Sequence, residues 1–388
     1  VCIPKLVTDP EAILTISNTF LEKDYMYNFT KDLFGNGLLT ANSKIWKTHR
    51  KLLNPAFSQS VLNNFIGCFN SQARNLVNDL ASNLGKLFDF INTKYSSLQH
   101  KYLSLVPKIQ MILVERFQKL WFHIDFIYNL SSLKQKQDAF SKSFVLLSES
   151  VRKWYNIVTY FPVLDKQKPF LELILDLSNE TKCFTDEEIR QQTDIIIAGG
   201  HETTATALNL VLVILGSHAD IQEKVYNEIF QIVGYSDKDF DKDDLPKLVY
   251  TEAVLKETLR LYPLVPFVSR YIDKDIKLEK YTLKANSSCL LFFYGLNRHP
   301  IWGPDADQFK PERWLDTNAL PDSICFGSFA IGKRNCIGKK YAMMSMKITL
   351  AHVLRTYRVS ADISKVVFKW HMMTYPASGH HYTLERRD

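Results

Sequence analysis

The most informative segment of the chain reads Phe329-Ala330-Ile331-Gly332-Lys333-Arg334-Asn335-Cys336-Ile337-Gly338, and the helix-favouring stretch 339–350 follows it directly. A thiol just before a helix N-terminus, among basic side chains, should be stabilised as a thiolate. Gly332 permits a tight turn, and Gly338 lets a flat partner approach the backbone. A thiolate protected on such a loop suits an axial haem ligand. Because a lone cysteine is more often a buried structural residue, Cys336 needs support from other parts of the chain.

The same segment also suggests a phosphate-binding loop. Residues 327–333 match that pattern up to its last position, where Arg334 replaces the Ser or Thr that would hold magnesium. No clear strand precedes the loop. Nucleotide binding is therefore the weaker alternative.

Composition places the chain among ordinary globular proteins. It has 388 residues, of which 46% are hydrophobic and 23% charged, and a formal net charge of +7. These values exclude disordered, collagen-like and coiled-coil classes. The charge is spread along the chain, so nucleic acid is not an expected partner. The six cysteines form no CxxC pair, which favours a reducing compartment over a disulfide scaffold or a zinc site.

The chain offers no obvious membrane span. No run approaches the ~18 apolar residues needed to cross a bilayer, and the longest candidate, residues 207–215, includes Asn209. The first residues, from Val1, do not resemble a signal peptide. Since the chain begins with Val rather than Met, we expect further residues before Val1 in the native protein.

Capping patterns and prolines predict where helices begin and end. Asp9 followed by Pro10 predicts one start. Ser43 predicts another, for a helix that must end near Pro55. A later helix is expected to end at Leu261. Residues 57–169 are helix-like and aromatic-rich but carry no recognisable chemistry.

One predicted helix is unusually long. Thr185-Asp186-Glu187-Glu188 forms a capping box with an acidic first turn, and the periodic run behind it extends to Gly216, ~45 Å of helix. Gly199 and Gly200 in its middle each cost ~1 kcal/mol relative to Ala. A compensating function is therefore expected at this point of the helix.

Strand-like runs appear in the last third of the chain. They are Tyr281–Lys284, Ser288–Tyr294, and a pair, Val366–Tyr375 and Tyr382–Leu384, that flanks the turn residues 376–379. The acidic stretch 237–244 is interpreted as a solvated loop, because Lys242 and Leu248 stand where a calcium loop needs Gly and Glu. The pattern favours one mostly helical domain with small sheets.

Four further motifs accompany the cysteine loop. They are Trp46-x-x-x-Arg50, Gly199-Gly200-His201-Glu202-Thr203-Thr204, Glu257-Thr258-Leu259-Arg260 and Phe309-Lys310-Pro311-Glu312-Arg313-Trp314. Each is weak alone, since Glu-x-x-Arg is usually a surface ion pair. In this order, and ending in the cysteine loop, they resemble the cytochrome P-450 superfamily of haem-thiolate monooxygenases over nearly the whole chain. The resemblance implies a mainly α fold with minor β sheets, in one large haem-binding domain over residues 1–388.

The resemblance implies haem b as cofactor. It makes Cys336 the axial iron ligand, a thiolate that favours O–O cleavage. Phe329 would shield the thiolate, and Gly332 and Gly338 would shape the loop around it.

Haem also carries two propionates, which need cationic or N–H partners. Trp46, Arg50 and Arg334 match the partners used in the family. Arg270 lies where the family usually supplies another.

The long helix resembles the family's oxygen-activation helix. By resemblance, Gly199 and Gly200 form a groove over the haem, while Thr203 and Glu202 relay protons to bound oxygen. Thr203 is also expected to hydrogen-bond to a carbonyl one turn back. His201 is interpreted as a packing residue. Separately, the set Glu257, Arg260 and Arg313 resembles the family's structural triad, which stabilises the core rather than acting in chemistry.

Residues 9–57 and 302–347 look most like the family-4 clan, with its insect members nearest. Many family-4 enzymes carry a Glu that can esterify haem at the position of Gly199, so no covalent haem link is expected here. The resemblance begins well inside the usual family sequence. It implies that the membrane anchor, the first helix and the first strands lie outside this chain, and that the protein is located on the cytoplasmic face of the endoplasmic reticulum membrane, the microsomal fraction.

The implied activity is insertion of one oxygen atom from dioxygen into an apolar substrate, such as a fatty acid, hormone or xenobiotic. No Gly-x-Gly-x-x-Gly fingerprint is present, so electrons should come from an NADPH-cytochrome reductase, with cytochrome b5 as a further partner. A docking face could be formed by Lys333, Lys339, Lys340 and Lys347, although an ordinary solvated surface explains them equally well.

Two alternatives stay open at this point. One is a truncated haem-binding protein with little or no turnover. The other is a peroxide-using or isomerising haem-thiolate enzyme, which Glu202 with Thr203 disfavours.

Overall fold

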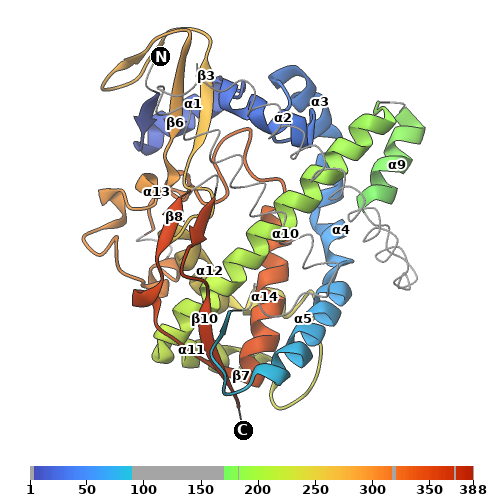
Figure 1. The fold of residues 1–388 in the computed structure, drawn as a ribbon, viewed down its shortest axis with the longest axis vertical. Helices are drawn as coiled ribbons and strands as arrows, with labels where there is room; N and C mark the ends of the chain where they lie inside the picture. Colours follow the sequence, from blue (N-terminus) through green and yellow to red (C-terminus); the bar gives the residue numbers. More distant parts are fainter. Residues whose placement is uncertain (1–3, 90–169, 182, 317–319, 371–372, 388) are drawn as a thin grey trace, which may run out of the picture.

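The computed structural model describes residues 4–89, 170–181, 183–316, 320–370 and 373–387. Its α-helices are α1 (Pro10–Thr19), α2 (Asn28–Phe34), α3 (Ser43–Leu53), α4 (Gln59–Asn63), α5 (Ile66–Leu80), α9 (Phe170–Thr181), α10 (Asp186–Ser217), α11 (Ala219–Val233), α12 (Val249–Leu261), α13 (Phe293–Leu296) and α14 (Lys339–Thr356). Helices dominate and the strands form small sheets, so the predicted fold class is confirmed (Figure 1). Most of the helix-like stretch 57–169 lies outside the described residues.

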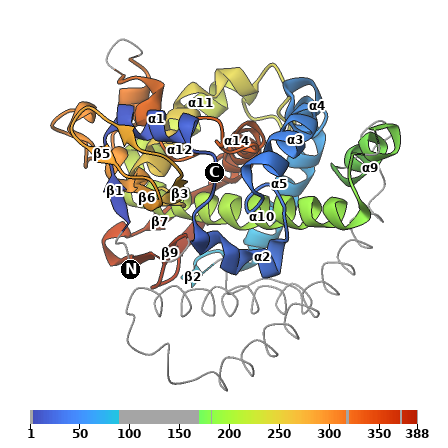
Figure 2. The same cartoon turned by 90° about the horizontal axis from the view of Figure 1, so that it is seen from above.

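Helix α10 crosses the whole molecule, as both Figure 1 and Figure 2 show. Its predicted capping box is present: the Glu188 N–H donates to Thr185 Oγ1 at 3.2 Å, and the Thr185 N–H donates to Glu188 Oε2 at 2.9 Å. The helix has 32 residues, about 48 Å at 1.5 Å per residue. The other elements are arranged around it.

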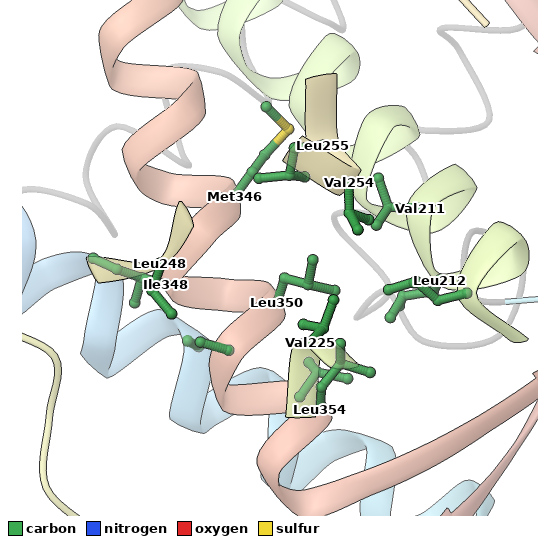
Figure 3. Packing of buried hydrophobic residues seen from close by; sticks show 14 of the residues in the cluster. Val211, Leu212, Val225, Leu248, Val254, Leu255, Met346, Ile348, Leu350 and Leu354 are labelled. Carbon is green, nitrogen blue, oxygen red and sulfur yellow. The ribbon is translucent and has the colours of Figure 1, made fainter. Parts of the chain in front are cut away.

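The main hydrophobic core lies around the C-terminal half of α10. Helices α5, α11, α12 and α14 supply most of its side chains. Figure 3 shows Val211 of α10, Leu255 of α12 and Leu350 of α14 converging there, and all three are fully buried. Each such side chain contributes about 1.5–3 kcal/mol. This core fixes α10 and α14, the two helices that border the candidate site.

The strands form two three-stranded sheets and two hairpins within the described residues. The strands are β1 (Lys5–Val7), β2 (Phe88–Asp89), β3 (Val268–Ile272), β4 (Ile276–Lys277), β5 (Thr282–Leu283), β6 (Ser287–Leu291), β7 (Tyr357–Ala361), β8 (Phe368–Trp370), β9 (Thr374–Pro376) and β10 (His381–Arg386). In the first sheet β6 lies between β1, which is parallel to it, and β3, which is antiparallel. Helix α1 packs on this sheet and forms a second core with it.

The predicted strand run 366–375 is not a single strand. It contains β8 and β9, which pair with each other, so that Phe368 faces Pro376 and Trp370 faces Thr374. Strand β10 pairs with β2 and β7. The reason is burial, since Tyr382 and Leu384 are both fully buried in the main core.

The N-termini of α1 and α3 lie close to where the sequence predicts them. The start of α1 is confirmed, because Asp9 Oδ1 accepts the Ala12 N–H at 2.9 Å. The cap of α3 is off by one residue: Asn42, not Ser43, accepts the Ile45 N–H through its side chain. Asn is at least as good an N-cap as Ser, and the next residue then becomes the first helical one.

In the acidic stretch 237–244, lysines pair with the buried Asp244. The Asp244 carboxylate lies 3.0 Å from both Lys238 Nζ and Lys247 Nζ, and no cluster of metal-ligating side chains occurs in the described ranges. Across those ranges, no helix by itself is both long and apolar enough to cross a membrane. Only α10 and α11 taken together meet that test, and they meet at an angle of 113°.

Candidate active site

The Cys336 loop is a sequence of tight turns before α14. Ala330 has φ of 56° and Gly332 has φ of 74°, and the Cys336 N–H closes the loop by donating to the Phe329 carbonyl at 2.8 Å. A left-handed conformation costs a non-glycine residue such as Ala330 about 1–2 kcal/mol. A Cβ on Gly332 would also lie 2.6 Å from Ser17 Cβ. Glycine is therefore required at 332, as the sequence indicates.

The Cys336 thiol has the stabilising neighbours predicted from the sequence. Cys336 is exposed, and the backbone N–H groups of Gly338 and Lys339 with the charges of Arg50 and Lys339 lower the pKa of its thiol. Desolvation by the surrounding protein raises that pKa by more, so these neighbours reduce the rise without reversing it. A bound metal ion deprotonates a coordinating thiol outright.

Helix α3 docks on the cysteine loop. The Arg50 guanidinium donates to the Asn335 carbonyl at 2.7 Å, to Asn335 Oδ1 at 3.0 Å and to Asn54 Oδ1 at 2.7 Å. The Trp46 ring is buried, with the Arg334 guanidinium carbon 4.7 Å from its centroid. The structure thus brings three of the predicted propionate partners together beside the cysteine, with Arg50 directed to the loop itself.

Two buried guanidiniums have donors without acceptors. Arg334 donates to the Ala41 carbonyl at 2.8 Å and Arg270 to the Ser269 carbonyl at 2.9 Å. Arg334 Nε and Nη1 and Arg270 Nε are buried and make no hydrogen bond within the described part of the chain. Burial lowers both pKa values, and the neighbouring Arg270 charge helps to lower that of Arg334 to about 10. Buried charged donors call for an anion, and the two carboxylates of haem fit them.

The backbone of α10 is open at Gly199 and Gly200, an opening that we call the glycine groove. Both glycines are exposed, and among the described residues a Cβ on either would meet no atom within 4 Å. Thr203 Oγ1 donates to the Gly199 carbonyl at 2.6 Å, so the predicted bond one turn back is confirmed. His201 and Glu202 are half-buried, and burial lowers the pKa of His201. The helix backbone is therefore uncovered at Gly199 and Gly200 within the described part of the chain.

Comparison with known proteins agrees with this geometry. The family model described as cytochrome P-450 matches residues 87–377, about three quarters of the chain. The chain belongs to the cytochrome P-450 family. Members of this family are haem-thiolate monooxygenases, so the predicted enzyme class is confirmed and haem is the cofactor that the family implies.

Curated relatives place this P-450 in the family-4 clan, as predicted. Mouse cytochrome P-450 4V2 is 30% identical over an alignment that covers 91% of this chain and 73% of the mouse protein. Cytochrome P-450 4c3 of Drosophila melanogaster is 29% identical, with 92% and 74% covered. Mammalian and insect relatives match about equally, so these identities do not favour the insect branch.

Solved structures give the same fold. The haem domain of a cytochrome P-450DA mutant superposes with a TM-score of 0.81 at 20% identity, covering 99% of this chain and 87% of that one. A second structure, the cytochrome P-450 CYP102L1, has a TM-score of 0.79.

The P-450 triad forms as its motifs predict. Glu257, fully buried, accepts from Arg260 Nε at 2.8 Å, from Arg260 Nη2 at 2.9 Å and from Arg313 Nε at 2.9 Å. Burial by itself would raise the pKa of Glu257, but the hydrogen bond and charge of Arg260, with the hydrogen bonds of Arg313 and the Lys310 N–H, outweigh it and lower the pKa. Arg260 also donates to the carbonyls of Asn297 and Ala306 at 2.7 and 2.6 Å. Through these bonds the triad holds the segment between Asn297 and Ala306, which precedes the cysteine loop in the sequence.

Asn297 connects this triad to the cysteine loop and was missed from the sequence. Its Oδ1 accepts the Gly327 N–H at 2.8 Å, and its Nδ2 donates to Ser328 Oγ at 2.9 Å and to the Arg260 carbonyl at 3.0 Å. Asparagine near a turn is ordinarily a solvent-facing residue, so no local signal marks it.

The proposed basic docking face needs one correction. Lys333, Lys339 and Lys340 are exposed. Lys347 is buried, and its Nζ is 2.8 Å from Glu252 Oε2. It stabilises the packing of α14 on α12 and is not available to a partner protein.

Proposed function

We propose that this P-450 oxidises an apolar substrate, a fatty acid, hormone or xenobiotic, with haem b held by Cys336. The observation that carries the proposal is the set of acceptor-free guanidinium N–H groups of Arg270 and Arg334 beside the cysteine loop. Cys336 would bind the iron, and Arg270, Arg334 and the Trp46 indole would bind the carboxylates. Phe329 would pack beside the thiolate, with Gly338 leaving its face open.

Arg50 would support the haem site indirectly, by positioning the cysteine loop. Its guanidinium fixes Asn335, the residue before the ligand, so it would hold the loop in register while contributing positive charge. When bound, haem supplies the redox-active iron at which dioxygen is reduced. The protein's own contribution is to position that group, exclude water and deliver protons.

Proton delivery is assigned to Thr203 and Glu202. The Thr203 hydroxyl lies at the glycine groove and is oriented by the Gly199 carbonyl, so its oxygen is held in one place. A carboxyl on the next residue can resupply the proton that the hydroxyl passes on. The groove of Gly199 and Gly200 leaves room beside the hydroxyl for dioxygen.

Thr203→Ala should separate oxygen consumption from product formation. Supplied with an NADPH-cytochrome reductase, a fatty-acid panel and ¹⁸O-labelled dioxygen, the parent should place one labelled atom in the product and the other in water. Without the hydroxyl, oxygen is reduced by two electrons and two protons to hydrogen peroxide instead. We expect product per NADPH to fall about tenfold or more, with peroxide rising in step.

Thr203→Ser keeps the hydroxyl and should restore most of the coupling. Unlabelled product from the parent would contradict the monooxygenase assignment. Haem binding without any product would favour the alternative of a haem-binding protein with little turnover. Product formed with peroxide but not with the reductase would favour the peroxide-using class.

Haem should be released from the denatured protein. Gly199 has no side chain that could form an ester, so nothing at this position of α10 can link haem covalently. Acidified organic solvent should therefore extract all of the haem, as judged by chromatography at the haem and protein absorbances. Haem that co-elutes with the protein would contradict this proposal.

The redox partners and the cellular location are proposed from membership of the P-450 family. An NADPH-cytochrome reductase, with cytochrome b5 as a further donor, would dock on Lys333, Lys339 and Lys340. The proposed location is the cytoplasmic face of the endoplasmic reticulum membrane, and one domain over residues 1–388 is proposed as the functional unit.

A further inference from the structure

We infer that Lys23 is a third cation of the haem-carboxylate site and binds one of the two carboxylates together with Arg270 and Arg334. This inference rests on the proposed function, because it presumes that haem occupies the site. Lys23 belongs to none of the motifs found in the sequence.

The backbone places Lys23 beside Arg270. The Tyr271 N–H, on β3, donates to the Glu22 carbonyl at 3.2 Å, which fixes the segment between α1 and α2 against the strand that carries Arg270. Tyr27 lies close to the same strand, because burial raises the pKa of its phenol while the Arg270 charge and the Ser269 backbone act to lower that pKa. Residues on both sides of Lys23 therefore lie against β3.

The Lys23 ammonium has an aromatic neighbour but no ion pair. Its Nζ lies 4.1 Å from the centroid of the Tyr27 ring, and no carboxylate of the described residues forms a salt bridge with it. A cation over a ring gains only about 0.5–2 kcal/mol. Such a contact orients the ammonium without neutralising it.

The two acids next to Lys23 in the sequence are hydrogen-bonded to other groups. Glu22 Oε2 accepts the Ser43 N–H at 2.8 Å. The buried Asp24 accepts the Met26 N–H at 3.0 Å and hydrogen-bonds the Ser288 hydroxyl. Neither acid serves as the counter-ion of Lys23.

The charged groups that act on Lys23 are positive, as Lys23 itself is. Burial lowers its pKa well below the usual value, and the positive charges of Arg270 and Arg334 lower it further. The Glu22 carboxylate acts on Arg334, but one carboxylate does not balance two arginines and a lysine, so the three cations still repel one another unless a further anion joins them. A ligand with two carboxylates satisfies the free N–H groups of both arginines and the ammonium at once.

The test is the rate at which ferric holoprotein gives up haem to excess apomyoglobin. We expect Lys23→Met to release haem about tenfold faster or more, the effect of losing one hydrogen bond to a charged group. Lys23→Arg, which keeps the charge, should release haem at close to the parent rate. Lys277→Met on β4, an exposed lysine, removes the same charge elsewhere and should change nothing. Lys23→Gln serves as a second neutral variant if Lys23→Met does not fold.

Haem with both carboxylates methyl-esterified supplies a chemical control. If Lys23 binds a carboxylate, parent and Lys23→Met should release the ester at equal rates. The inference is overturned if the parent and Lys23→Met release ordinary haem at equal rates. It is also overturned if Lys23→Met still releases the esterified haem faster than the parent does. A parent that binds no haem, or lacks the thiolate spectrum, would instead overturn the proposed function.

Discussion

Replacing Cys336 by Ser is expected to abolish the strongly red-shifted Soret band of the reduced, carbon-monoxide-bound protein. The band depends on a thiolate opposite the carbon monoxide, and the serine hydroxyl is far too weak an acid to replace it. Cys336 is the cysteine of the loop before α14, where Gly332 and the Phe329 carbonyl fix the chain. The measurement is the difference spectrum of the reduced protein with and without carbon monoxide.

Cys68→Ser is the matched control. Cys68 is an exposed cysteine on α5, outside the loop, and its replacement should leave the band unchanged. Persistence of the band in Cys336→Ser would refute the ligand assignment. A parent protein without the band would remove the basis for the haem-thiolate proposal as a whole.

Glu257→Ala is expected to lower the free energy of unfolding by about 3–5 kcal/mol. The carboxylate is fully buried between two arginines, and it also accepts the Trp314 Nε1–H at 2.9 Å and the Lys310 N–H at 3.0 Å. Its removal leaves Arg260 buried with no counter-ion and frees the segment that Arg260 holds. Denaturant unfolding followed by circular dichroism measures the loss.

Glu279→Gln removes an exposed carboxylate and should stay within about 0.5 kcal/mol of the parent. A Glu257→Ala protein that unfolds within about 1 kcal/mol of the parent would contradict a structural role for the triad. If Glu257→Ala loses catalysis but unfolds with the same free energy as the parent, Glu257 has a role in the reaction rather than in the stability of the fold.

Local signals in the sequence predicted local structure well. The capping box at Thr185 and the Asp9-Pro10 pair depend only on residues within one turn, and both form as expected. The Cys336 turn was predictable for the same reason, because Gly332 needs a positive φ whatever surrounds it. Fixed motifs then connected the cysteine to Trp46, Arg50 and Glu257 through family resemblance.

Features set by distant partners were not predictable. Lys347 was expected at the surface, but Glu252, 95 residues earlier, pairs with it in the interior. Strand β10 was predicted, but its partners β2 and β7 lie far away in the sequence, and the burial of Tyr382 and Leu384 that fixes this pairing depends on the whole core. Asn297 and Lys23 act through contacts across the fold, and nothing in their immediate sequence marks them.

The attachment of Arg50 to Asn335 also sets the order of events during synthesis. The two residues are 285 positions apart, which at 5–20 residues per second separates their emergence from the ribosome by roughly 15–60 s. Helix α3 is therefore synthesised well before the loop on which its arginine docks. Because Cys336 lies in that loop, the proposed haem site cannot be complete until residue 336 has left the ribosome, and until then α3 exists without the contact between Arg50 and Asn335.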